Sequence, residues 1–195
     1  MKKLSDQEII NSILKGNTED FKYIIDRYKD KAFSLLVRMI KNQQDAEEAL
    51  QDSFLKAYKA LPGFKWESKF SSWFYRIVYN TALTKIANNK TNIETIDIEF
   101  DDNDEPVNDL SSLYDDNDMQ FSDITNFSEI INNLLAKLPV RYSAVISMFY
   151  LDEMSIEEIA SSTGMTVTNV KVTLHRARNL LKSIAEKTNI KHEIY

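Results

Sequence analysis

The sequence predicts an all-α fold in which two small helical domains are joined by an acidic, flexible linker. Apolar residues recur at helical spacing in both halves of the chain, and only three Gly interrupt its 195 residues. One central segment also differs sharply in charge from its flanks. We therefore divide the chain into an N-terminal domain (1–92), a linker (93–127), a C-terminal domain (128–185) and a tail (186–195).

Four helices are expected in the N-terminal domain. Their boundaries follow from residues that start helices with a side-chain oxygen and from residues that stop them. The expected starts are Ser5 or Asp6, Thr18, Asp45, and Ser71 or Ser72, in chain order, and Pro62 with Gly63 stops the third helix.

The loop and helix after Gly63 are rich in aromatic residues. Seven aromatics lie between Phe64 and Tyr79, interleaved with Lys and Arg. Aromatic rings beside cations can stack unpaired bases while the cations hold the backbone. Packing in a core is the alternative, and we assign Trp73, Phe74 and Ile77 to it. For the loop residues Phe64 and Trp66 we favour a ligand.

Residues 138–182 have the pattern of a helix-turn-helix. Ser155 followed by Glu158 is a helix start, and Gly164 suits the left-handed backbone of a tight turn. Thr166 or Thr168 can cap the second helix. Its apolar stripe consists of Val170, Leu174, Ala177 and Leu181, and its opposite face carries Thr168, Lys171, Val172, His175, Arg176 and Asn179.

This polar and cationic face is suited to base edges and phosphates. The alternative is that Lys and Arg solvate an exposed helix. The overall charge of −6 is unusual for a nucleic-acid binder, but 13 acidic residues and no Lys or Arg lie between Lys90 and Lys137. Both flanking segments are therefore mildly basic. A calcium loop at 97–102 is disfavoured because it lacks the glycine such a loop needs.

Composition argues against several other functions. The chain has no Cys, only two His without a triad or zinc arrangement, and no glycine-rich phosphate loop. We therefore expect no enzymatic activity, metal, cofactor or small-molecule substrate. Charges interrupt the longest apolar runs and no signal peptide is recognisable, which predicts a cytoplasmic protein without membrane insertion.

Three ordered segments resemble regions 2 and 4 of an extracytoplasmic-function (ECF) sigma factor of the sigma-70 family. They are DAEEALQDSFLKAYKALPGF, KFSSWFYRIVYNTA and LPVRYSAVISMFYLDEMSIEEIASSTGMTVTNVKVTLHRARNLL. The resemblance implies a C-terminal domain that is a winged-helix-like region 4. It also implies binding to core RNA polymerase through the β′ coiled coil and the β flap, promoter-specific initiation, and a probable anti-sigma factor.

The resemblance further implies three groups of contact residues. Phe64, Trp66, Tyr75, Arg76, Tyr79 and Asn80 would read and hold the melted minus-10 strand. Thr168, Lys171, Val172, His175 and Arg176 would read the minus-35 element. Asp45, Glu48, Gln51, Asp52 and Phe54 would bind core polymerase.

Two departures from the family pattern are visible. The fourth helix ends with only two cations where a run of Arg is common, and Val172 replaces a small polar residue, which suggests a methyl contact to thymine. Two other functions remain open. The chain could be a DNA-binding regulator that dimerises through its N-terminal domain, or a nucleic-acid-binding module without a polymerase partner.

Overall fold

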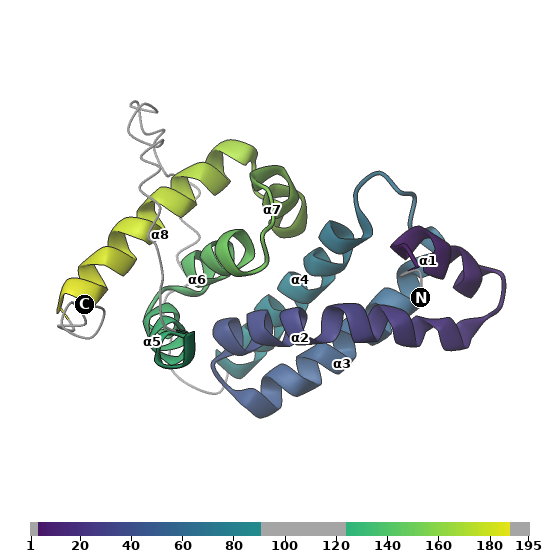
Figure 1. The fold of residues 1–195 in the computed structure, drawn as a ribbon, viewed down its shortest axis with the longest axis horizontal. Helices are drawn as coiled ribbons and strands as arrows, with labels where there is room; N and C mark the ends of the chain where they lie inside the picture. Colours follow the sequence, from purple (N-terminus) through teal and green to yellow (C-terminus); the bar gives the residue numbers. More distant parts are fainter. Residues whose placement is uncertain (1–3, 91–123, 188–195) are drawn as a thin grey trace.

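The computed structural model describes residues 4–90 and 124–187, and every regular element within these ranges is a helix (Figure 1). The all-α prediction is confirmed. The described ranges contain no strand, so they provide no β wing beside the helix-turn-helix. The acidic stretch, including the calcium-loop candidate, falls mostly outside the described residues.

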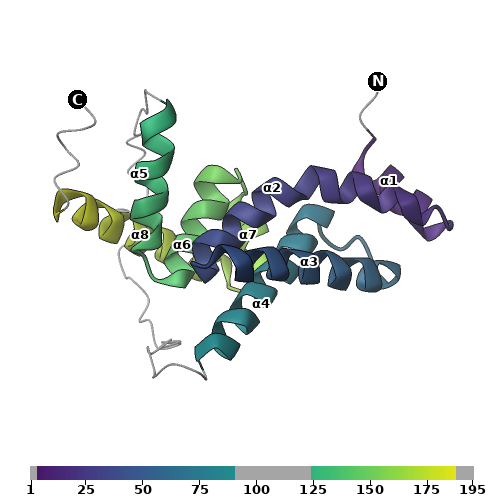
Figure 2. The ribbon, with the colours of Figure 1, turned by 90° about the horizontal axis from the view of Figure 1, so that it is seen from below.

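The N-terminal lobe, residues 4–90, consists of four long helices and two short 3-10 turns. Its elements are α1 (Asp6–Leu14), η1 (Thr18–Asp20), α2 (Phe21–Ile40), α3 (Gln43–Ala60), η2 (Leu61–Gly63) and α4 (Phe70–Lys90). Helices α2, α3 and α4 pack against one another, and α1 lies at the far end of α2 (Figures 1 and 2).

Two of the predicted helix starts are corrected. Helix α3 begins two residues before Asp45, because the Asn42 side chain accepts a hydrogen bond from the Asp45 amide at 3.0 Å. Helix α4 begins at Phe70, ahead of both predicted serines. Ser5 caps α1 through a reciprocal pair of hydrogen bonds with Glu8, as one of the two alternatives predicted.

The C-terminal lobe, residues 124–187, is a compact group of helices. Its elements are α5 (Ile124–Ala136), α6 (Val140–Ile146), the π-helical turn η4 (Ser147–Leu151), α7 (Ile156–Thr163) and α8 (Val167–Lys187). Because α5 begins at residue 124, the last residues assigned to the linker are helical.

The helix-turn-helix prediction is confirmed in its local chemistry. Ser155 and Glu158 form a complete capping box at the start of α7. Gly164 ends α7 with φ 76°, a left-handed conformation that glycine adopts without steric cost. The Thr166 hydroxyl then accepts a hydrogen bond from the Asn169 amide at 3.2 Å, at the start of α8. The two helices are therefore held at a sharp turn.

The two lobes pack against each other. Helix α7 lies against α4, and α5 and α6 lie against α2, whereas α8 runs along the outer side (Figure 1). Buried apolar residues of both lobes belong to one continuous core, which includes Leu35 and Phe74 on one side and Leu138 and Ile159 on the other. The two domains predicted from the sequence are thus in close contact.

Candidate nucleic-acid interface

The loop between α3 and α4 presents one exposed aromatic ring on a buried aromatic cluster. Trp66 is 38 % exposed and lies 4.7 Å, between ring centroids, from Phe64. Phe64 is buried and packs in turn against Phe70 and Trp73, at 5.8 and 4.9 Å. Of the two loop aromatics, only Trp66 is accessible to a ligand in this conformation, whereas the buried Phe64 ring packs against the Trp66 ring.

Trp66 also has an unusual backbone. Its φ is 61°, one of three positive values among the described non-glycine residues. A left-handed conformation costs a bulky L-residue about 1–2 kcal/mol, and such strain concentrates at functional sites. The loop therefore holds an exposed indole in place at an energetic cost.

Helix α4 divides the remaining predicted residues between two surfaces. Arg76 and Asn80 are exposed to solvent. Tyr75 and Tyr79 are 3 % and 6 % exposed, because the C-terminal lobe covers them. Trp73, Phe74 and Ile77 pack in or against the core, as predicted. In this conformation Arg76 and Asn80 are therefore accessible to a ligand, whereas Tyr75 and Tyr79 are not.

Helix α8 presents its first turns at the surface. Residues 166–169 are exposed, and Lys171, His175 and Arg176 are half-buried. The His175 ring nitrogen Nε2 lies 3.0 Å from the Asn179 side-chain amide, which orients the ring along the helix. The exposed Thr168 and the side chains that follow it form the surface expected of a recognition helix, whose N-terminal residues meet base edges.

The prediction for Val172 needs correction. We expected its methyl groups to point outward, but Val172 is only 8 % exposed. Neighbouring Thr173 and Leu174 are also buried, so the packed side of α8 is wider than the narrow stripe predicted. The methyl contact to thymine is therefore not available to Val172 in this conformation, whereas Val167, at the start of α8, is 38 % exposed.

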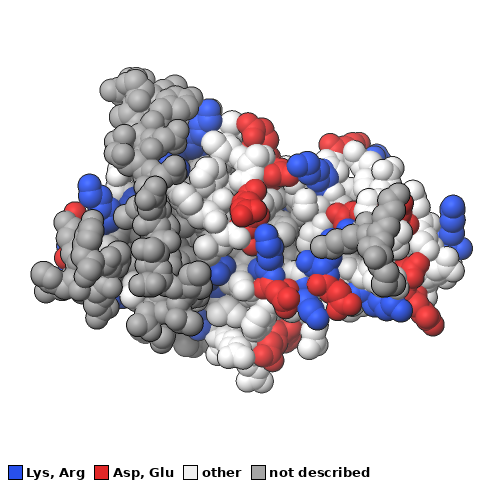
Figure 3. All heavy atoms as spheres, in the orientation of Figure 1, with Lys and Arg blue, Asp and Glu red and all other residues white. Residues whose placement is uncertain are grey.

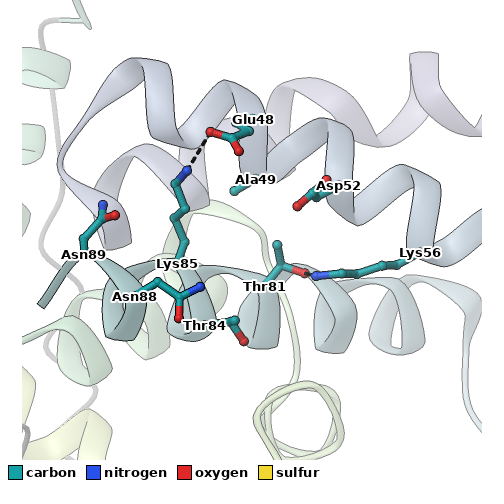
Figure 4. Close-up of a pocket in the computed structure, with 9 residues that line it drawn as sticks. All are labelled: Glu48, Ala49, Asp52, Lys56, Thr81, Thr84, Lys85, Asn88 and Asn89. Carbon is teal, nitrogen blue, oxygen red and sulfur yellow. Dashed lines mark hydrogen bonds and ion pairs between the residues drawn. The ribbon is translucent and has the colours of Figure 1, made fainter. Parts of the chain in front are cut away.

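A polar groove lies between α3 and the C-terminal half of α4 (Figure 4). Lys85 of α4 spans it, with ion pairs of 2.6 Å to Glu48 and 3.2 Å to Asp45. These contacts raise the pKa of Lys85, chiefly through the hydrogen bond to Glu48. Asp52 lines the same groove, whereas Gln51 is exposed but does not line it. Three of the five predicted polymerase-binding residues, Asp45, Glu48 and Asp52, therefore lie at the groove or pair with its Lys85.

Phe54, the fifth, is a core residue. Its ring is 8 % exposed and lies 4.9 Å from Phe74 and 6.3 Å from Phe21. Phe54 was predicted to contact polymerase directly. In this structure its ring is buried and is not accessible to a partner. Phe54 supports the helix that carries the other four residues.

The sequence did not identify Asp152, which follows η4 and lies at the junction of the lobes. Burial raises the pKa of its carboxyl group to about 6, against the opposing effects of Lys31, Arg38 and Tyr75. Burial and the nearby Asp152 in turn raise the pKa of Tyr75. No local pattern marks this residue, since its neighbours come from α2 and α4 more than 70 positions away.

Acidic and basic side chains alternate over the described part of the face in Figure 3. Such a mixed surface supplies little long-range attraction for a polyanion. Among residues 4–90 and 124–187, no group of His, Cys, Asp or Glu has the arrangement of a metal site. In the same ranges, no helix is long and apolar enough to cross a bilayer.

The fold and these surfaces define a two-lobed helical protein with a helix-turn-helix in one lobe and an aromatic loop in the other. Residues 24–91 match the family described as Sigma-70 region 2, and residues 128–181 match Sigma-70, region 4. The chain is 33 % identical over 175 residues to the ECF RNA polymerase sigma factor SigW of Bacillus subtilis, covering 89 % of this chain and 92 % of that protein.

Other relatives agree. The ECF RNA polymerase sigma-E factor of Escherichia coli is 28 % identical over 183 residues, covering 91 % of this chain and 93 % of that protein. The RNA polymerase sigma-H factor of Pseudomonas aeruginosa is 26 % identical over 181 residues, covering 90 % and 91 %. The chain belongs to the ECF RNA polymerase sigma factors of the sigma-70 family. It is a promoter-recognising initiation factor, and sigma factors are DNA-recognition regulators and not catalysts.

Solved structures share the fold. CnrH, in complex with the cytosolic domain of CnrY, superposes with a TM-score of 0.64 at 18 % identity, covering 93 % of this chain and 97 % of CnrH. The sigma factor RpoE of Bartonella quintana, in complex with the anti-sigma factor NepR, gives 0.62 at 19 % identity, covering 86 % and 98 %. The helical arrangement is therefore one that solved sigma factors adopt.

Proposed function

We propose that the two lobes divide promoter recognition between them. The aromatic loop and α4 hold the melted minus-10 strand, and α8 reads the minus-35 element in duplex DNA. The observation that carries this assignment is Trp66, an exposed indole held in a strained backbone in the loop before α4, a helix that also exposes Arg76 and Asn80.

The energetics are consistent with such a division. Extruding a base costs a few kcal/mol, and stacking on an aromatic ring returns about 1–3 kcal/mol per base. One or two aromatic contacts therefore suffice once polymerase has distorted the duplex. The mixed surface charge predicts weak binding to DNA in the absence of polymerase.

Helix α3 is the proposed contact with the β′ coiled coil of core polymerase, through Asp45, Glu48, Gln51 and Asp52. Asp45 and Glu48 are already paired with Lys85, so polymerase would have to compete for those carboxylates. Asp52 and Gln51 are exposed, so a partner can reach them directly. We expect the β flap to contact the C-terminal lobe.

Three further features belong to this proposal. The chain acts without catalytic activity of its own, it works in the cytoplasm where polymerase is found, and an anti-sigma factor restrains it. Two solved structures support restraint by an anti-sigma factor. One contains the sigma factor RpoE bound to the anti-sigma factor NepR, and the other contains CnrH bound to the cytosolic domain of CnrY.

The test is run-off transcription with purified core polymerase and the Trp66→Ala variant. Loss of stacking at one base predicts roughly 5- to 150-fold less open complex, measured as permanganate reactivity of unpaired thymines. Binding to core polymerase should be unchanged. Tyr23→Ala, which removes an aromatic that is 43 % exposed on α2, is the matched control and should melt DNA normally.

Two results would contradict the proposal. If the Trp66→Ala variant melted promoter DNA normally, the loop that carries Trp66 would not hold the melted strand. Transcription independent of the wild-type chain, together with nanomolar binding of duplex DNA without polymerase, would instead indicate a stand-alone regulator.

A further inference from the structure

Helix α4 already holds two of the α3 carboxylates that are proposed to meet polymerase. Lys85 Nζ lies 2.6 Å from a carboxylate oxygen of Glu48, across the groove shown in Figure 4. The same ammonium lies 3.2 Å from Asp45 Oδ1. Asn89, one turn further along α4, donates a hydrogen bond to Asp45 Oδ2 at 2.9 Å. A small network of charged and amide groups therefore joins α3 to the C-terminal half of α4.

The two carboxylates differ in how easily a partner can reach them. The Glu48 side chain is 65 % exposed, whereas the side chains of Asp45 and Lys85 are 26 % and 21 % exposed. Asp45 is held by both Lys85 and Asn89. A cation that approaches from solvent can therefore reach Glu48 while Asp45 keeps its contacts within the groove.

The pair between Lys85 and Glu48 can be exchanged at small cost. Water screens a carboxylate near the surface, so replacing one cation by another changes its free energy little. If Glu48 turned toward a partner, Lys85 would retain Asp45. The exchange would leave no unpaired charge in the groove, and an unpaired charge is the outcome that makes broken ion pairs expensive.

A second lysine of the same groove provides a comparison. Lys56 of α3 also lines the groove, but its Nζ donates a hydrogen bond to the hydroxyl of Thr81 at 3.1 Å. The two lysines carry the same charge. Lys85 is bound to carboxylates, whereas the bonded partner of Lys56 is a neutral hydroxyl.

We propose that Lys85 is an internal competitor for Glu48, which lowers the affinity of this chain for core polymerase and is displaced from Glu48 by a basic side chain of the polymerase. This inference rests on the proposed contact between α3 and the β′ coiled coil. It predicts that removal of the Lys85 charge strengthens binding to polymerase. A lysine that only supported the structure of the lobe would have the opposite effect.

Two substitutions of Lys85 test the competition in titrations of labelled core polymerase with the full chain. Lys85→Met removes the charge and keeps an unbranched apolar side chain, and it should bind roughly 1.5- to 5-fold more tightly, as expected for the loss of one exposed ion pair. Lys85→Arg should bind more weakly than the wild type, because a guanidinium can form two parallel hydrogen bonds with a carboxylate.

Lys56→Met is the matched control, since it removes the same charge from the same groove. Its effect on binding should be smaller than that of Lys85→Met. In the background of Glu48→Gln, Lys85→Met should lose most of its effect, because the carboxylate for which Lys85 competes is gone. The effect of Lys56→Met should be the same in both backgrounds. Urea denaturation of each variant checks that it is folded.

Three results would overturn the competition. The first is unchanged or weaker binding by Lys85→Met in a chain whose binding Glu48→Gln does weaken. The second is an equal gain from Lys56→Met and Lys85→Met, which would assign the effect to net charge alone. The third is binding by Lys85→Arg as tight as that of the wild type, which decides the matter even if Lys85→Met fails to fold.

Failure of the proposed polymerase contact has a different signature. In that case neither Glu48→Gln nor Asp52→Asn would weaken binding to core polymerase, and the competition would fall with the contact.

Discussion

At the scale of single residues, burial separates the aromatics that support the site from those that can touch a ligand. Phe64 and Trp66 are two positions apart and chemically alike, yet Phe64 is buried on Trp73 whereas Trp66 is exposed. Composition predicted an aromatic site in this loop, but it could not distinguish the two roles. The distinction depends on how the loop folds back onto α4, which no local pattern encodes.

Asp152 carries a buried carboxyl group whose pKa depends on the packing of the two lobes. Its pKa is raised to about 6 in the closed form, in which the lobes pack together, and would return toward the ordinary value near 4 if the lobes separated. The closed form then binds the proton more tightly, so closure is favoured as the pH falls from about 6 to 4. Above pH 6, the buried carboxylate opposes closure.

We therefore expect spin labels on Tyr23→Cys and Lys187→Cys, at exposed positions of α2 and α8, to show more closed protein at pH 5 than at pH 7.5. Asp152→Asn removes the ionisable group, and its closed fraction should be nearly independent of pH over that range. Equal pH dependence in Asp152→Asn and in the wild type would assign the effect to another group.

At the scale of elements, helix ends were the most predictable features. Ser155, Glu158 and Gly164 act through bonds and backbone angles within a few residues of themselves, and the structure confirms all three. Helix α3 shows the limit of such reasoning. Asn42 and Asp45 are both good caps, and the choice of Asn42 became clear only from the hydrogen bond that its side chain makes.

The two capping boxes offer a matched pair of substitutions. Ser5→Ala and Ser155→Ala each remove one side-chain cap, and each should lower the free energy of unfolding by about 1 kcal/mol in urea denaturation. Only Ser155→Ala should also weaken minus-35 recognition by holoenzyme, because α7 orients α8. Equal promoter binding by both variants would show that α8 is oriented by its packing alone.

At the scale of the whole molecule, the charge pattern predicted two helical parts but did not predict that they would pack together. The shared core joins residues as distant as Leu35 and Ile159. Contacts of this range depend on complementary shapes on α4 and α7, which alternation of polar and apolar residues does not specify. The buried tyrosines of α4 are the direct result of that packing.

This coupling can be measured because both Trp residues of the chain lie in the N-terminal lobe. Leu174→Ala creates a cavity in the C-terminal lobe and should destabilise it by about 2–5 kcal/mol. If the lobes support each other, the Trp fluorescence transition in urea should move to lower denaturant as well. An unchanged Trp transition would show that the lobes unfold independently.

The continuous apolar core has a thermal consequence. Separating the lobes would expose apolar surface to water, and such exposure carries a positive change in heat capacity. The free energy of opening is therefore curved in temperature, with the closed form most favoured at an intermediate value. Cooling below that temperature weakens the apolar contact between α4 and α7, so the free energy needed to separate the lobes decreases.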